Sequence, residues 1–226
     1  MNFLQLAQAV KRESGLTGSV TGYINAIAED LRIFSWVNWA ARDITLSRED
    51  WRWRRATAVL ASTTNQSNTS TDFALTDFAS WKPSNNVYRP SAYRIADTAA
   101  SEHPLQWLDY DTFMQRFGIG TQTPGVSTYW TVSPTDAIML GPAPDTEHYV
   151  RADYARDYTE MVTDSDTPLL PARFHSLIVW GALMEYGGFD AASEVYQRAE
   201  KNYASTLAQL IQSQTVPMSF TARSLA

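Results

Sequence analysis

The sequence predicts an α+β protein, a helical bundle built from N-terminal helices and a C-terminal helical hairpin, with an inserted small antiparallel β region. Apolar residues recur at helical spacing near both ends of the chain, whereas the middle carries short strand-like runs separated by Pro and Gly. The chain has 226 residues, 44% of them hydrophobic, which is enough to bury a full core. The expected parts are N-terminal helices in residues 1–50, a β-rich insert in 51–162, the helical hairpin in 163–212 and an extended tail in 213–226.

The first predicted helix covers residues 2–14. Its apolar residues follow one helical stripe and are Phe3, Leu6, Ala7 and Val10. Asn2 is a candidate N-cap because its side chain can accept a hydrogen bond from a free backbone amide of the first turn. Gly15 can adopt the left-handed conformation that commonly follows the last helical residue. We therefore expect an amphipathic helix here.

A second predicted helix runs to about Ile44 and is apolar on two faces. One stripe consists of Ile24, Ile27, Ala28, Leu31 and Phe34, and the other of Ile33, Trp36, Val37 and Ala40. A helix that is apolar on both faces must be covered on both. In a single subunit it would be a central core helix, whereas in a ring one face could form a subunit interface.

The segment after Ser47 combines tryptophans with the one basic cluster of the sequence. Trp51, Arg52, Trp53 and Arg54 alternate with period two, which favours a strand or an extended exit from the helix. Alternating aromatic and basic residues can bind a nucleic-acid strand, or they can place tryptophans in a core while the arginines pair with carboxylates. Because the net charge is −6, structure or subunit contact is the favoured interpretation.

The middle of the chain is predicted to be mostly short strands. Residues 63–71 are nearly all Ser, Thr, Asn and Gln, which is typical of a mobile loop or arm. A turn is expected at 133–136, where Pro stands at the second position. A short helix is expected near 111–117. The strand candidates are Ala92–Ile95, Thr128–Val132, Ala137–Leu140 and Tyr149–Tyr154.

The C-terminal part is predicted to be a helical hairpin followed by a polar tail. Pro171 suits the first turn of a helix whose stripe ends at Gly187 and Gly188. A second helix is expected over about 190–211, with Glu194 and Arg198 as a supporting pair. The tail carries its apolar residues at alternating positions, namely Val216, Met218 and Phe220.

Composition excludes several classes of function. The chain has no cysteine, which excludes disulfides, thiolate metal sites and a cysteine nucleophile. No run of apolar residues is long enough for a membrane span, and the N-terminal residues lack a signal-peptide pattern, so we expect a protein made and kept in a cytoplasm. The 8 Trp and 11 Tyr residues favour an assembly protein, because such side chains are enriched at interfaces.

No catalytic, metal-binding or cofactor-binding constellation stands out. The three histidines, His103, His148 and His175, lack a second histidine at ligand spacing, and His175 is interpreted as a polar residue on the outer face of a helix. The close carboxylate pairs are interpreted as turn and capping residues rather than as the acid and base of a glycosidase. These pairs are Asp109 with Asp111, Glu49 with Asp50, and Asp164 with Asp166.

Two segments resemble the head-to-tail adaptor (connector) proteins of tailed bacteriophages, particularly of the short-tailed type. Residues 31–55, LRIFSWVNWAARDITLSREDWRWRR, look like that family's passage from a helix into a DWRW motif. Residues 164–210, with DSDTPLLPARFHSLIVWGALMEYGG and then YQRAEKNYASTLAQL, are similar to the family's C-terminal helical pair. The opening FLQLAQAVKRESGLTG is of the same type, and the middle of the chain is not matched in detail.

The resemblance implies a structural virion protein without catalytic residues, made in the host cytoplasm and placed at the head-tail junction. It would form a homo-oligomeric ring, usually a dodecamer, that joins the capsid portal to a tail or nozzle protein and lets double-stranded DNA pass without specific binding. We expect portal contacts at Val216, Met218 and Phe220, and subunit contacts at Trp36, Trp51, Arg52, Trp53 and Arg54. Another tail or baseplate subunit, a virion glycosidase or a carbohydrate-binding module remain alternatives.

Overall fold

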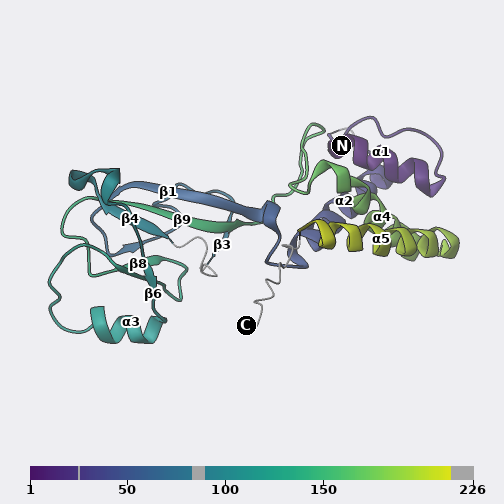
Figure 1. Ribbon diagram of the computed structural model, residues 1–226. Helices are drawn as coiled ribbons and strands as arrows, with labels where there is room; N and C mark the ends of the chain where they lie inside the picture. The colour runs from purple at the N-terminus through teal and green to yellow at the C-terminus, as the bar shows by residue number, and fades with distance from the viewer. Residues whose placement is uncertain (25, 83–89, 215–226) are drawn as a thin grey trace, which may run out of the picture. The chain divides into compact units, whose positions relative to one another are not determined.

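The computed structural model describes residues 1–24, 26–82 and 90–214, and within them the protein is α+β. Two compact units form, one from Met1–Trp53 with the described residues from Tyr158 onward, the other from Arg54–Asp157. Figure 1 shows helices in the first unit and mostly strands in the second. We call them the helical unit and the β unit, and each is described by itself.

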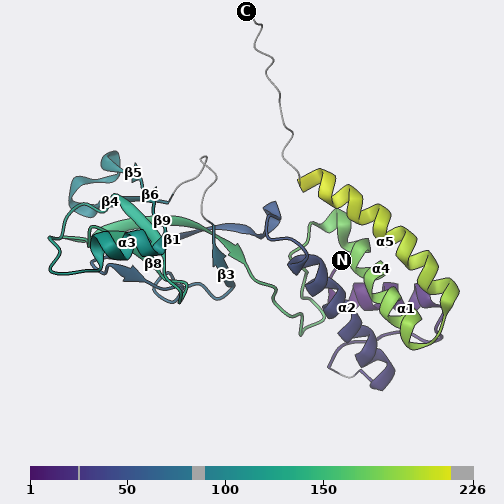
Figure 2. The ribbon, with the colours of Figure 1, turned by 90° about the horizontal axis from the view of Figure 1, so that it is seen from below.

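The helical unit contains four α-helices in the described residues. They are α1 (Phe3–Ser14), α2 (Ala28–Leu46), α4 (His175–Phe189) and α5 (Ser193–Gln214). A short 3₁₀ helix, η4 (Ala172–Phe174), precedes α4, and another, η1 (Arg52–Arg54), lies at the boundary with the β unit. Helix α4 contacts α1, α2 and α5, so it is the central element of this unit (Figure 2).

The first helix forms as the sequence predicts. Asn2 caps α1 by accepting a hydrogen bond from the Gln5 amide at 2.9 Å, and the Gln5 side chain accepts one from the Asn2 amide at 3.0 Å. Gly15 ends the helix in the left-handed conformation, with φ of 79°. The reciprocal bonds satisfy two amides that a helix start otherwise leaves free.

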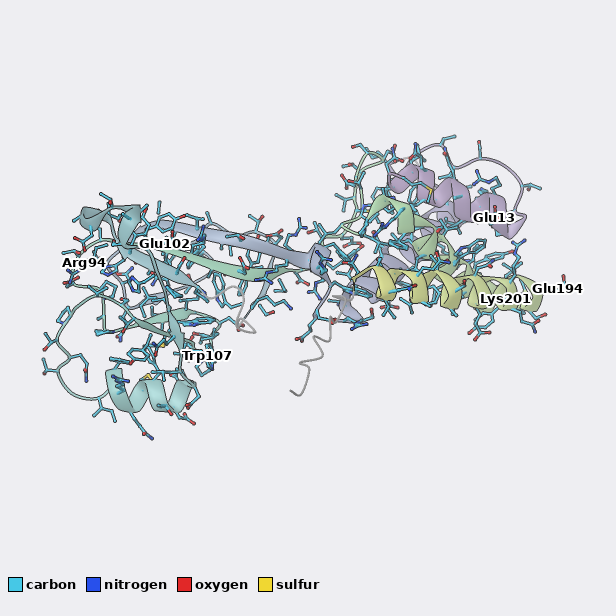
Figure 3. The ribbon with its side chains drawn as sticks, viewed as in Figure 1. Glu13, Arg94, Glu102, Trp107, Glu194 and Lys201 are labelled. Atoms are coloured by element: carbon cyan, nitrogen blue, oxygen red, sulfur yellow. The ribbon has the colours of Figure 1, made fainter. Side chains whose placement is uncertain are left out.

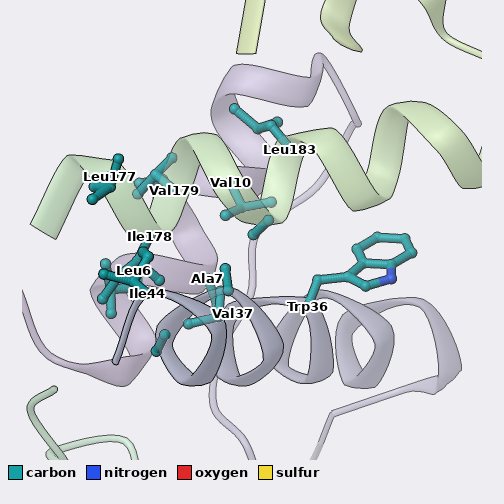
Figure 4. Packing of buried hydrophobic residues seen from close by; sticks show 14 of the residues in the cluster. Leu6, Ala7, Val10, Trp36, Val37, Ile44, Leu177, Ile178, Val179 and Leu183 are labelled. Carbon is teal, nitrogen blue, oxygen red and sulfur yellow. The ribbon is translucent and has the colours of Figure 1, made fainter. Parts of the chain in front are cut away.

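The first predicted apolar stripe of α2 is only partly buried, with Phe34 in the core. The helix begins at Ala28 rather than at Ile24, because Ile27 has an extended backbone and forms the N-cap. Ile24, Ile27 and Leu31 are exposed, so the expectation that both faces are covered is wrong for this end of the first stripe. The other stripe packs against α1 and α4, as Figure 4 shows for Trp36 and Val37.

The helical core also contains a buried ion pair. Lys11 Nζ in α1 lies 2.8 Å from Asp30 Oδ1 in α2, and the two side chains are only 8% and 9% exposed. Exposed Glu29 lies 4.0 Å from the same ammonium. The pair fixes α1 to the first turn of α2, since either charge alone would be buried without compensation.

The end of α4 differs from its prediction. The helix continues through Gly187 and Gly188 to Phe189, and the chain then turns into α5 at Ala191, whose φ is 52°. A Cβ on Gly187 would lie 3.0 Å from the Tyr196 backbone nitrogen. Glycine is therefore needed here for the close approach of α5, not for helix termination.

The β unit contains two sheets around one core. The first has strand order β1-β9-β4-β5, with β3 also paired to β9, and the second has order β2-β8-β7-β6. The strands are β1 (Arg55–Thr63), β2 (Ser67–Asn68), β3 (Phe78–Trp81), β4 (Ser91–Arg94), β5 (His103–Pro104), β6 (Gln106–Trp107), β7 (Tyr129–Val132), β8 (Ile138–Gly141) and β9 (His148–Arg156). Helix α3 (Tyr110–Phe117) contacts β7, and its position agrees with the predicted short helix.

The sheets are antiparallel except for one pair. β6 runs parallel to β7, so the prediction of a purely antiparallel region is wrong at this edge. The core joins both sheets and includes Trp81, Trp130, Ile138, Leu140 and Val150. Parallel strands need a long crossover connection between them. The connection between β6 and β7 contains α3 and meets this need.

The polar segment 63–71 is more regular than a loop. Ser67–Asn68 form β2 against β8, and Asn68 is buried. Thr63 Oγ1 donates to Asn68 Oδ1 at 2.6 Å, and Asn68 Nδ2 donates to the Asn65 carbonyl at 3.0 Å. The polar side chains satisfy one another, which lets this stretch enter the sheet without apolar residues.

We expect Asp30→Ala to destabilise the protein by about 3–5 kcal/mol, because it leaves the Lys11 ammonium buried and uncompensated. Urea unfolding measures the loss. Glu29→Ala removes the exposed neighbouring carboxylate and should cost less than about 1 kcal/mol. A Lys11→Met, Asp30→Leu double variant should recover most of the stability, and a loss equal to that of the single variant would contradict this account.

Candidate interaction groove of the helical unit

An open groove of about 580 Å³ lies where α2, α4 and the start of α5 meet. Its walls are mostly aromatic and apolar. The lining residues are Arg32, Trp36 and Trp39 of α2, Met184, Glu185, Gly188 and Phe189 of α4, and Tyr196 of α5. We call these residues the aromatic groove.

The floor and the rim of the groove differ in exposure. Trp36 is 7% exposed, and its ring centroid lies 5.7 Å from that of Phe189. Phe189 and Trp39 are 60% and 54% exposed. The Arg32 guanidinium carbon lies 4.6 Å from the Phe189 ring centroid, a cation–π geometry that fixes the rim. Two large aromatic side chains thus face solvent beside a well-packed floor.

A second glycine lets the helices form this arrangement. A Cβ on Gly181 of α4 would lie 2.9 Å from the Ala40 methyl of α2 and 3.4 Å from the Tyr203 ring of α5. The absence of a side chain lets both helices approach α4 closely. One turn before the end of α4, the Tyr186 hydroxyl donates a hydrogen bond to Asp190 Oδ2 at 2.9 Å. This bond stabilises the last turn of the helix.

The residue composition of the groove resembles that of a binding surface. Its one basic and one acidic residue, Arg32 and Glu185, stand among aromatic side chains, and none of the lining residues is a histidine, serine or threonine. Trp, Tyr, Phe, Met and Arg are the residues enriched in protein interfaces, where they supply large contact area. The groove can therefore receive apolar side chains of another protein surface.

Four of the predicted subunit-contact residues do not line the groove. Trp51 is buried, its indole donates to the Ile44 carbonyl at 2.9 Å, and its ring stacks on Trp53 with centroids 6.0 Å apart. Arg54 is also buried and donates from Nε to the Arg156 carbonyl at 2.8 Å. Arg52 is exposed.

The backbone around these residues also corrects a prediction. Arg52–Arg54 form a 3₁₀ helix, and the strand begins only at Arg55, so the period-two pattern did not indicate a strand there. The buried indole bond explains why, because it holds Trp51 against the end of α2. Contacts of these residues with another subunit remain a prediction. Val216, Met218 and Phe220 lie outside the described residues.

Each of the three histidines contacts a backbone carbonyl. His175 is buried, not on an outer face as the sequence suggested, and its Nε2 lies 2.9 Å from the Leu170 carbonyl. Burial lowers the pKa of the His175 imidazole. His103 bonds to the Ser101 and Ser127 carbonyls. Periodicity missed the burial of His175 because η4 shifts where α4 begins.

The carboxylate pairs occupy turns and caps. Asp109 caps α3 by accepting from the Thr112 amide at 2.9 Å, and hydrogen bonds from Thr112 lower the pKa of the Asp109 carboxyl. Asp166 accepts from the Val162 and Thr163 amides at 2.7 and 2.8 Å. Asp164 accepts from the Tyr23 amide at 2.7 Å. No group of three metal-ligating side chains occurs within the described ranges.

Arg198 of α5 pairs with a residue of α1 rather than with Glu194 of its own helix, which the sequence predicted. Arg198 donates to the Glu13 carbonyl at 2.6 Å and lies 3.8 Å from the Glu13 carboxylate, so it joins α5 to α1. The predicted partner within the helix was Glu194. Figure 3 labels both glutamates, Glu13 at the end of α1 and Glu194 at the start of α5. The tertiary contact replaces the local one because it adds a backbone acceptor.

Sequence reasoning missed most of the groove. Arg32, Trp39, Phe189 and Tyr196 were not selected as site residues, and only Trp36 was. A signal was present for Trp39, because helical spacing places it near Arg32, Ser35 and Arg42 and away from the buried stripe of α2. Tryptophan is enriched at protein interfaces, so a tryptophan on the outer side of a helix is a candidate contact residue.

The helical unit thus exposes a groove with the residue types that are enriched in protein interfaces. No helix in the described part of the chain has the length and apolar character to cross a bilayer. The chain belongs to the SU10 adaptor protein family, whose family model matches residues 1–223. It is thus a structural adaptor of bacteriophage virions, as the resemblance implied. The comparison with curated proteins gave no match.

The two tryptophans of the groove should differ in their effect on stability. We expect Trp36→Ala to cost about 3–5 kcal/mol in the free subunit, because it leaves a cavity in the core. Trp39→Ala, on the same helix but mostly exposed, should cost less than about 1 kcal/mol. Chemical denaturation of both variants measures this, and equal losses would show that the groove floor is not part of the core.

His175 should make stability depend on pH. Its pKa is lowered in the folded state, so the unfolded chain takes up a proton first as the pH falls below about 6.5. We therefore expect stability that is fully present above this pH to decrease as the pH falls further. Urea midpoints at pH 7.5 and 5.5 measure it, and His175→Asn should reduce the difference. If the variant shows the same difference in urea midpoint, the pH dependence comes from other titratable groups.

Proposed function

We propose that the protein is the head-to-tail adaptor of a tailed bacteriophage, assembled as a homo-oligomeric ring that joins the capsid portal to the tail at the head-tail junction. The ring, a dodecamer in this proposal, surrounds the channel through which double-stranded DNA passes. The family match over residues 1–223 carries the proposal. The groove supports it because exposed aromatic side chains beside a rigid floor suit permanent contact with another subunit.

Charge supports the role of a channel wall. The protein has 24 acidic and 18 basic residues, and phosphate contacts from basic residues are what hold DNA. Several arginines are already engaged with the protein itself, such as Arg48 with Asp50 at 2.8 Å and Arg94 with Asp145. DNA can pass such a surface without being retained.

In this proposal the helical unit works as one bundle in which α4 and α5 form a hairpin. Trp36, Trp51, Arg52, Trp53 and Arg54 belong to or support the contact between subunits. The exposed Arg52 would reach a neighbour directly, whereas the buried tryptophans would hold the surfaces in place. The tail-side partner would be a tail or nozzle protein.

Electron cryomicroscopy of the purified protein mixed with its portal tests the proposal. A ring seated on the portal is the expected result. A position elsewhere in the particle would identify another tail or baseplate subunit instead. Activity on peptidoglycan that a single carboxylate change abolishes would indicate a virion glycosidase, and either result would overturn the adaptor assignment.

The residues after α5 should attach the protein to the portal. We expect that removing residues 215–226 abolishes co-sedimentation with portal rings but leaves the stability of the free subunit unchanged. Phe220→Ala should weaken the association by roughly 2 kcal/mol, as the loss of a buried anchor does. Normal co-sedimentation of the truncated chain would locate attachment in the helical unit.

A further inference from the structure

Helix α2 carries a second exposed apolar surface besides the aromatic groove. Ile24, Ile27 and Leu31 are 86%, 67% and 42% exposed, and they lie before α2 and in its first turn. We call these three residues the aliphatic ridge. None of them lines the groove.

The ridge and the groove are separate surfaces around α2. Leu31 lies about 140° around the helix axis from Trp36 on the groove floor and about 80° from Trp39 on its rim. The buried residues of α2 that face the core include Ile33, Val37 and Ala40. Each subunit thus presents an exposed aliphatic surface and a separate aromatic groove.

We infer that the aliphatic ridge of one copy inserts into the aromatic groove of a second copy, and this inference rests on the ring proposed above. A cyclic ring needs two different surfaces on every subunit, since a contact between identical surfaces closes at a dimer. The ridge and the groove are such a pair, because they are different surfaces of the same subunit and both are largely apolar.

The energetics favour the same pairing. Burying an isoleucine or leucine side chain contributes most to the free energy of association when the side chain loses little conformational freedom. The χ1 rotation of isoleucine is already restricted by its branched Cβ. The groove floor is held by Trp36 against Phe189 and Tyr186, so little ordering is needed on that side either. The ridge residues themselves carry no charge that would have to be desolvated.

Cysteine pairing tests the contact, and the chain has no native cysteine to interfere. One chain carries Leu31→Cys, and a second chain of different tag size carries Gly188→Cys. Gly188 lines the groove, and a Cβ there meets no atom within 4 Å, so the cysteine displaces no side chain. The two chains are mixed with portal rings, oxidised and separated by size under non-reducing conditions.

We expect disulfide-linked heterodimers in this mixture at least tenfold above those from Leu46→Cys with Gly188→Cys. Leu46 is the matched control because it lies on α2 and is 46% exposed, close to the 42% of Leu31. Equal yields in the two mixtures, or none in either, would overturn the inference.

The same samples separate this inference from the adaptor assignment. Co-sedimentation with the portal without selective cross-linking would support the adaptor function and contradict the ridge-to-groove contact. Selective cross-linking without portal binding would support the contact as self-association and count against the adaptor function. Failure of both measurements would count against both.

Discussion

The packing of α4 against its three neighbours is the constraint on which the helical unit depends. Leu177, Ile178, Ala182 and Leu183 are fully buried, and they face α1, α2 and α5 from one helix. Because α4 is surrounded, it needs apolar residues on nearly every side and glycines where the neighbours approach most closely. Gly181 and Gly187 meet that need at the crossings with α2 and α5.

This packing also explains where apolar surface remains uncovered. Helix α2 can turn only one face toward α4 and α1, so the side chains on its outer flanks stay in solvent. Trp39 and Leu31 are such residues. The same helix that helps to complete the core thus also carries exposed apolar side chains.

The β unit is organised by a different interaction. Trp130 of β7 lies in a core shared by both sheets, and its ring meets exposed Trp107 of β6 edge to face, with centroids 4.7 Å apart. Figure 3 labels Trp107 in this unit. The long strand β9 joins the unit, because it pairs with β1 on one side and with β3 and β4 on the other.

Local patterns were sufficient where a segment's neighbours in sequence decide its structure. The cap at Asn2, the stop at Gly15 and the short helix at 110–117 depend on residues within a few positions, and the sequence predicted each. The strands β4, β7, β8 and β9 also lie close to their predicted ranges, because alternation along a short run needs no distant partner. The family resemblance likewise rested on contiguous segments.

Only the tertiary structure decided which apolar residues are covered. Ile24 and Ile33 look equally suited to a core in the sequence, yet one is exposed and the other fully buried. The position of α4 makes this choice, and α4 is more than 130 residues away in the chain. The burial of His175, the pairing of Arg198 with Glu13 and the aromatic groove have the same origin. By itself, the sequence determined several of the elements and the family. The groove required the contact of three helices, which no local pattern records.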